Sequence, residues 1–165
     1  MDFGAPAERG RVRRMQISAV AHVIAVDPGT TESAVVQWNG TAIVSAKKMP
    51  NAEVEHELAT TFPGNTVLIE WITSYGMRVG QEVFDTCRWI GRFEVAAGSA
   101  ILVPRREVKM WHCGKPGAKD ADVIGALKEK YGEKGTKANP GTTYPLSKDA
   151  WQAFALAAYW TEKNG

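Results

Sequence analysis

Two acidic residues occupy equivalent positions in the sequence, and this arrangement suggests metal-assisted chemistry on a phosphodiester. Asp27 is the first charged residue after the apolar run at residues 22–26, and Glu70 is the first after the apolar run at residues 66–69. Short apolar runs that stop at turn residues or charges are typical of buried strands. If the two strands are parallel neighbours, their ends bring the carboxylates together, and each raises the pKa of the other.

A divalent cation would remove that repulsion, because Mg²⁺ prefers oxygen ligands and keeps several waters. Two such ions about 4 Å apart stabilise the attacking and leaving oxygens of a phosphodiester displacement. A second interpretation stays open at this point. Asp27 and Glu70 would show the same pattern if they were surface acids at strand ends, held by helix N-termini or backbone amides.

Three further acids stand at the starts of predicted helices. Asp149 lies in the first turn of the last predicted helix, and Asp120 and Asp122 begin the preceding one. The helix dipole favours acids in these positions whatever the function of the protein. The pattern alone therefore does not separate a ligand from a structural acid.

A basic segment and an aromatic loop are the candidate contacts to nucleic acid. The basic segment carries a single acid, Glu107, and these positive residues: Arg105, Arg106, Lys109, Lys115 and Lys119. Such a segment can neutralise several phosphates, although a solvated loop face would look the same. The loop at residues 71–78 contains Trp71, Tyr75 and Arg78, and its aromatic rings would either stack on unpaired bases or pack under the next helix.

The elements that must position these residues alternate between strands and helices. Asn39-Gly40 between two apolar segments predicts a β-hairpin. The predicted strands are residues 22–26, 33–38, 41–46, 66–69 and 100–103, and the predicted helices are residues 51–61, 80–97, 120–131 and a last one capped by Ser147, after a mobile loop at residues 132–144. This order predicts an α/β fold with a mixed sheet and helices on both faces, in which acids at strand ends share one edge.

Length and composition fit one soluble domain. The chain has 165 residues and a formal net charge of +2, which by itself does not indicate nucleic acid. Residues 1–20, with four arginines, are predicted to be a flexible basic arm that is either a leader or a contact to DNA. Cys87 and Cys113 form no Cys-x-x-Cys pair, so we expect reduced thiols, with Cys87 buried, in a cytoplasmic protein. No segment predicts a membrane span or a signal peptide.

At this point the sequence resembles a known family, the RuvC-like Holliday junction resolvases of the RNase H-like superfamily, nearest to their phage-type branch. The resemblance covers most of residues 23–160. It rests on these segments: Val26-Asp27-Pro28-Gly29-Thr30-Thr31 before a hairpin, Ile69-Glu70, Asp149-Ala150 opening a helix of small residues, and Val103-Pro104-Arg105-Arg106-Glu107-Val108-Lys109 followed by Gly114-Lys115-Pro116-Gly117-Ala118-Lys119. It implies a nuclease domain over residues 21–165, with an RNase H-like fold.

The resemblance also implies an activity, ligands and partners. Asp27, Glu70 and Asp149 would ligate catalytic Mg²⁺, or Mn²⁺ in its place, and Lys109 and Lys119 would contact DNA near the cleaved phosphate. Tyr75 would take the place of a wedge residue at the branch point. The partners would be a four-way DNA junction and a second copy of the chain, paired through the helix around residues 83–90. The location would be the cytoplasm of a bacterium or of a phage-infected host cell.

One position departs from the family pattern. The family has two ligand-type residues one turn apart at the start of its last helix, and here the second is Gln152, which supplies no charge. Asp120 or Asp122 would substitute, or the site would work with three carboxylates. Two alternatives therefore stay open: a nuclease of the same fold acting on flaps, forks or RNA–DNA hybrids, and an inactive DNA-binding module. The Asp27-to-Thr31 turn also resembles that of actin-like ATPases, but 165 residues are too few for their two lobes, so no nucleotide cofactor is expected.

Overall fold

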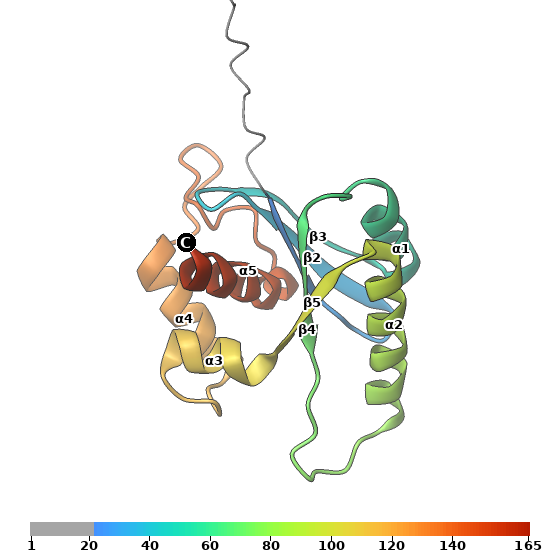
Figure 1. The fold of residues 1–165 in the computed structure, drawn as a ribbon. Coiled ribbons are helices and arrows are strands. Elements are labelled where there is room, and N and C mark those ends of the chain that lie inside the picture. The colour runs from blue at the N-terminus through green and yellow to red at the C-terminus, as the bar shows by residue number, and fades with distance from the viewer. Residues whose placement is uncertain (1–21) are drawn as a thin grey trace, which may run out of the picture.

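The computed structural model describes residues 22–165, and the predicted arm at residues 1–20 lies outside this range. The described chain has the predicted α/β architecture, a mixed five-stranded sheet between two layers of helices (Figure 1). The elements are β1 (Val23–Asp27), β2 (Glu32–Trp38), β3 (Ile43–Pro50), α1 (Asn51–Thr60), β4 (Thr66–Trp71), α2 (Gln81–Ala97), β5 (Ala100–Pro104), α3 (Arg105–Cys113), α4 (Asp120–Tyr131), the short 3-10 helix η1 (Lys148–Ala150) and α5 (Trp151–Asn164).

The strand order β3-β2-β1-β4-β5 divides the sheet at β1. On one side β1, β2 and β3 are antiparallel, and the predicted Asn39-Gly40 hairpin joins β2 to β3. On the other side β1, β4 and β5 are parallel. The carboxyl ends of these three parallel strands therefore reach the same edge of the sheet, which we call the carboxyl edge.

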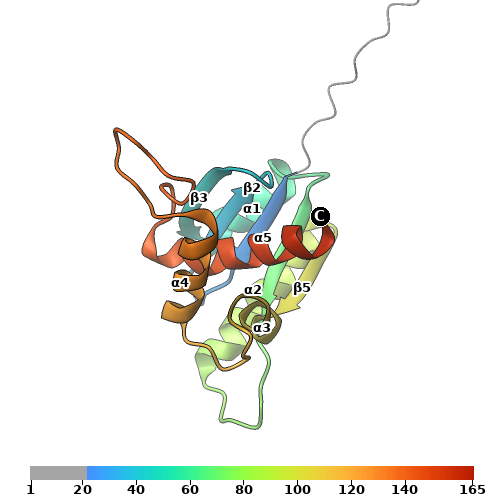
Figure 2. The same ribbon diagram turned by 90° about the vertical axis from the view of Figure 1, so that its left-hand side faces the viewer.

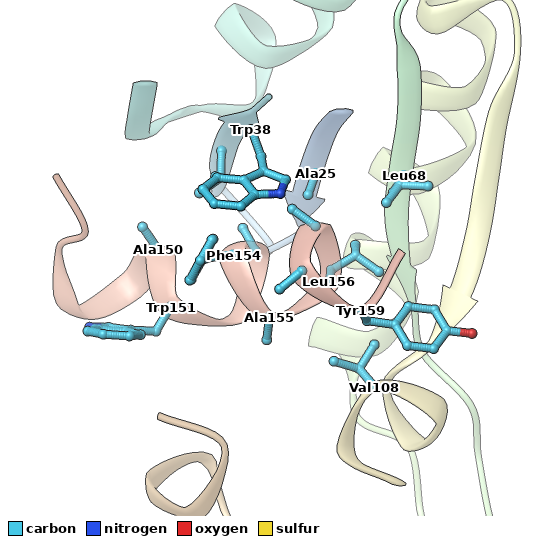
Figure 3. Packing of buried hydrophobic residues seen from close by; sticks show 14 of the residues in the cluster. Ala25, Trp38, Leu68, Val108, Ala150, Trp151, Phe154, Ala155, Leu156 and Tyr159 are labelled. Atoms are coloured by element: carbon cyan, nitrogen blue, oxygen red, sulfur yellow. The ribbon is translucent and has the colours of Figure 1, made fainter. Parts of the chain in front are cut away.

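The two faces of the sheet are covered by different helices, and strand alternation decides which residues meet them. Ile24 and Val26 of β1 pack with α1 and α2, whereas Val23 and Ala25 pack on the opposite face with α3, α4 and α5. Figure 2 shows α5 crossing this second face. Phe154 of α5 packs against Trp38, with ring centroids 5.2 Å apart (Figure 3). Because β1 is buried on both faces, its sequence is continuously apolar rather than alternating.

The sequence pattern predicts no helix at residues 105–113, where the structure has α3. The prediction is wrong because charge hides the periodicity: Val108 is the only buried residue of this helix. Its boundaries do carry signals, with Pro104 immediately before the first turn and Gly114 after the last, at a φ of 70°. The basic segment therefore presents its side chains from a rigid helix over its first nine residues.

The structure also corrects two smaller predictions, on Ser147 and Cys87, and bears on a third, the membrane span. Ser147 makes no side-chain capping bond, and η1 precedes α5, so the last helix does not begin in the predicted way. Cys87 is half-buried rather than buried, because it lies beside the exposed face of α2. Among the described residues, no helix is long and apolar enough to cross a membrane.

Candidate active site at the carboxyl edge of the sheet

Asp27 and Glu70 lie side by side at the carboxyl edge, as their matching sequence positions predict. Val26 of β1 pairs with Ile69 of β4 in parallel register, so the acid that follows each of these residues ends up beside the other. Glu70 is only 4% exposed, and Asp27 is half-buried. The strands thus hold two carboxylates together where few waters can solvate them.

A buried polar network fixes the turn that follows Asp27. The side chain of Asn51 donates to the carbonyl oxygen of Gly29 at 3.0 Å and accepts from the hydroxyl of Ser33 at 2.6 Å. The same hydroxyl accepts from the backbone N–H of Gly29 at 3.1 Å. A Cβ at Gly29 would lie 2.3 Å from the carbonyl oxygen of Glu32, so only glycine fits there. Ser33 and Asn51 therefore position Asp27 by holding its turn.

Asp149 reaches the same edge from the start of the last helical segment. It lines a cleft of about 330 Å³ together with Asp27, Asp120 and Gln152, and we call this the acidic cleft. Lys48 enters the cleft from β3, because the register aligns Asp27 with Ala34 and Ala34 with Lys48. The Nζ of Lys48 lies 3.4 Å from Oδ2 of Asp149, so the third predicted acid is held by a cation.

Arg105 joins the acidic cleft to a second hollow, of about 300 Å³, that contains Glu70 and Lys109 and that we call the Glu70 hollow. Its Nε lies 3.3 Å from Oε1 of Glu70, and its Nη2 lies 3.2 Å from Oδ1 of Asp120. The Nζ of Lys109 is 3.6 Å from the same oxygen of Asp120. Asp120 is therefore drawn into the site between two cations of α3.

The electrostatics of the pair follow from burial and from these neighbours. The pKa of Glu70 is raised to about 8, mainly by burial and then by the charge of Asp27, while Arg105 opposes the rise. Burial likewise raises the pKa of Asp27 to about 6, with Arg105 lowering it and with Asp120 and Asp149 raising it. Without a cation between them, the two acids hold protons that isolated carboxyl groups would lose.

The carboxylate oxygens of the site are suitable ligands for a hard divalent cation, although in this structure Arg105 and Lys48 pair with the acids. Within residues 22–165, no three His, Cys, Asp or Glu side chains are grouped as a metal site. The oxygen donors and the unfavourable charge of the adjacent Asp27 and Glu70 nevertheless suit Mg²⁺. The Nε of Arg105 is close to Glu70 but buried without a hydrogen bond, so this ion pair leaves one donor of the guanidinium unsatisfied.

The structure separates the remaining predicted residues into near and distant groups. Gln152 lines the acidic cleft, and Lys109 lines the Glu70 hollow. Asp122 turns away, because its Oδ2 accepts from the backbone N–H of Lys119 at 2.9 Å and lies 3.9 Å from Nζ of Lys115. Neither of these two lysines lines the acidic cleft or the Glu70 hollow.

Of the predicted contacts on the loop after β4, Tyr75 lines the Glu70 hollow and Arg78 does not. Tyr75 is 58% exposed and lies under the guanidinium of Arg106, 5.5 Å from its ring centroid. Arg78 is exposed in the same loop. The DNA contacts of all these residues stay predictions.

Sequence analysis missed three residues of the site: Lys48, Ser33 and Asn51. Counting outward from a two-residue Asn39-Gly40 turn would have placed Ser45 opposite Ala34, because the sequence does not show the longer turn and the register shift that bring Lys48 there. The hydrogen bonds of Ser33 and Asn51 depend on a contact between β2 and the start of α1, for which the sequence carries no local signal.

The strand order and the two helical layers define an α/β fold of the RNase H-like type. The solved structures agree: the chain has the fold of RuvC. It matches RuvC from Thermus thermophilus with a TM-score of 0.62 and 18% identity, over 87% of this chain and 96% of that one. A T. thermophilus RuvC in complex with a Holliday junction substrate matches with a TM-score of 0.59 and 14% identity, over 84% and 92% of the two chains. No protein-family model matches the sequence, and no curated protein does.

Proposed function

We propose that the chain is a Mg²⁺-dependent endonuclease that cleaves four-way junctions or other branched DNA. The observation that carries this proposal is the pairing of Asp27 with Glu70 at the ends of parallel strands, with Asp149 facing the same edge. The RuvC fold supports it, and one of the similar RuvC structures contains a Holliday junction substrate.

The proposed reaction is two-metal-ion hydrolysis of a phosphodiester. When bound by Asp27, Glu70 and Asp149, Mg²⁺ or Mn²⁺ would offset the charge on the attacking and leaving oxygens. The chain contributes the rest. Lys109 lines the Glu70 hollow, and its ammonium would offset negative charge on a phosphate bound there. Ser33 and Asn51 keep the turn after Asp27 in place.

We assign the additional acid of this site to Asp120. It contributes to the raised pKa of both Asp27 and Glu70, so its charge acts on the pair. Asp122 is occupied at the start of α4. Gln152 lines the acidic cleft but brings no charge to it. Asp120 therefore supplies the carboxylate that the departure at Gln152 removes.

We also propose that the active unit is a homodimer paired through α2. This helix exposes two large apolar side chains, Phe84 at 58% and Val95 at 83%. Ile90, at the end of the segment predicted to pair, is buried in the core of its own chain, so Phe84 and not Ile90 would lie in the interface. Two copies would present two active sites to a symmetric junction.

The test is a side-by-side nicking assay on a four-way junction, a flap, a fork, a linear duplex and an RNA–DNA hybrid. Each is incubated with Mg²⁺, with Mn²⁺ or with a chelator. We expect cleavage of the four-way junction with either metal and none with chelator. Preferential cleavage of the flap, fork or hybrid would replace the junction assignment with another nuclease activity of the same fold.

A second candidate function, a DNA-binding module without cleavage, is favoured by one observation. Arg105 and Lys48 already pair with Glu70, Asp120 and Asp149. In such a module, these cations would neutralise the acids permanently. The same assay decides the matter: junction binding without nicking in either metal supports the module and contradicts the nuclease.

A further inference from the structure

A third hollow, of about 640 Å³, lies between α3, the end of α5 and the loop after β4. Its size falls in the range of small-molecule binding pockets. We call it the aromatic hollow, and it is lined by Thr73, Tyr75, Pro104, Arg106, Glu107, Met110, Trp111, Tyr159 and Lys163. None of these except Tyr75 and Arg106 was singled out as a contact from the sequence. The proposed cleavage reaction uses neither Trp111 nor Lys163.

Helical spacing builds the walls of this hollow. Glu107 and Trp111 are four residues apart on α3, as are Tyr159 and Lys163 on α5, so each pair shares one helix face. Figure 3 shows Val108 of α3 beside Tyr159, where the two helices pack. The base of the hollow is therefore rigid, and the loop that carries Tyr75 closes its remaining side.

The aromatic rings are held in place yet remain open to a ligand. Trp111 is 43% exposed, and its indole N–H donates to Oε2 of Glu162 at 2.6 Å. The ring of Tyr159 meets that of Trp111 edge to face, with centroids 5.8 Å apart. The hydroxyl of Tyr159 donates to Glu107 at 2.8 Å. Side chains fixed in this way lose little entropy when a flat ligand binds.

The charges around the hollow favour an anion beside a flat apolar group. Arg106 lies over Tyr75, and the Nζ of Lys163 donates to the hydroxyl oxygen of Tyr159 at 2.8 Å. The one acid of the lining, Glu107, already accepts the Tyr159 hydroxyl. Aromatic faces beside cations are the features that bind an unpaired base together with its phosphates.

The aromatic hollow is continuous with the candidate active site. It shares Thr73, Tyr75 and Arg106 with the Glu70 hollow, which in turn shares Arg105 with the acidic cleft. Arg105 and Arg106, which are consecutive on α3, thus connect the three hollows into one continuous surface, with Arg105 towards the acidic cleft and Arg106 towards the aromatic hollow. A DNA strand with its phosphate at Glu70 would have its neighbouring nucleotides at Tyr75 and Trp111.

We propose that the aromatic hollow binds an unpaired nucleobase of the DNA strand next to the phosphate that is cleaved. This inference deepens the proposed function and rests on it for the identity of the strand. Base stacking on aromatic side chains contributes about 1–3 kcal/mol per base, which corresponds to about 5- to 150-fold in affinity.

The test measures strand binding in chelator, where no cleavage occurs. The probes are a fluorescent eight-residue oligothymidylate and a matched strand of eight abasic residues with the same phosphates. We expect the wild-type chain to bind the thymidylate at least 5-fold tighter than the abasic strand. Equal affinities would overturn the proposal and leave the hollow to another occupant, such as an apolar protein segment.

Three variants test whether the preference for thymidylate over the abasic strand comes from the aromatic hollow. Trp111→Leu keeps an apolar side chain but removes the flat ring, so the ratio of the two affinities should fall towards one, whereas Trp111→Phe should preserve it. Val44→Ser removes an exposed apolar side chain from β3, at the opposite edge of the sheet, and should change nothing. Circular dichroism verifies folding, and a folded Trp111→Leu variant with an unchanged ratio contradicts the proposal.

A fourth variant and the nicking assay separate this inference from the proposed function. Lys163→Ala should weaken both strands equally, because it removes a phosphate contact and no stacking surface; a loss confined to the thymidylate would overturn that role. A chain that nicks junctions but shows no base preference rejects the aromatic hollow alone. A chain that prefers bases at Trp111 but never nicks rejects the nuclease alone.

Discussion

The acidic cleft and the aromatic hollow both border the first turns of α3, yet they are built on opposite principles. The acidic cleft and the adjoining Glu70 hollow meet at strand ends, where Asp27 and Glu70 bring together like charges that burial makes unfavourable. The aromatic hollow sits between two helices, and its side chains satisfy each other through hydrogen bonds and ring contacts. The difference indicates that the first region is arranged for chemistry, at a cost in stability, and the second for recognition.

The largest expected effect is on junction cleavage, which should depend on the acidic cleft and not on the aromatic hollow. Asp27→Asn should reduce junction cleavage by roughly 10²- to 10³-fold or more, because it removes a charge where the transition state needs it, and should leave junction binding intact. Trp111→Leu should retain cleavage at saturating DNA. Single-turnover nicking and band-shift titrations measure both quantities. Wild-type cleavage by Asp27→Asn in Mg²⁺ would remove Asp27 from the reaction.

The next effect uses pH to test the cost in stability of burying Asp27 beside Glu70. Because the folded-state pKa values of Asp27 and Glu70 are raised to about 6 and about 8, the folded chain binds protons that the unfolded chain releases. Their contribution to stability is present below about pH 4 and is lost as the pH rises towards 8. Each proton contributes a slope of at most about 1.4 kcal/mol per pH unit.

Glu70→Gln should flatten this dependence and make the metal-free chain more stable than wild type at pH 8. Urea unfolding in chelator at several pH values measures it. Glu129→Gln, at an exposed position on α4, serves as the control. A variant as pH-sensitive as wild type would show that Glu70 carries no such penalty, and the contrast between the two regions would fail.

A smaller effect concerns the support beneath the acidic cleft. Asn51→Ala leaves the hydroxyl of Ser33 and the carbonyl of Gly29 without their partner, so the free energy of unfolding should fall by about 1–3 kcal/mol. Cleavage should fall with it while strand binding at the aromatic hollow persists. Asn164→Ala, which removes an exposed bond at the end of α5, is the matched control. Thermal unfolding and nicking measure the two outcomes.

The smallest effect tests whether Lys109 and Lys119 contact DNA, or whether Lys109 only pairs with Asp120. Replacing Lys109 and Lys119 with alanine should reduce the slope of log affinity against log salt by about 1.8, since each phosphate contact contributes about 0.9. Replacing Lys128 and Lys137 removes the same charge from α4 and the loop after it and should leave the slope unchanged. Equal slopes for the two double variants would confine Lys109 to pairing with Asp120.

The sequence predicted the fold and the acid pair because both depend on local patterns. Apolar runs that end in Asp27 and Glu70 identify strands, and parallel pairing of those strands then brings the acids together. The sequence did not predict α3, whose charged residues conceal a single buried position, Val108. Nor could it predict that Arg105 would lie among the acids, since that depends on how α3 and α4 pack at the carboxyl edge.

Gly29 limits which amino acids the turn after Asp27 can accept. A side chain there would push against the first residue of β2, and β2 is hydrogen-bonded to β1 as far as Asp27. The turn therefore tolerates mutation unevenly. Thr31 points to solvent and can be exchanged widely, whereas position 29 admits one amino acid. A library randomised over residues 28–31 and selected only for folding would recover glycine at position 29 and diversity at position 31.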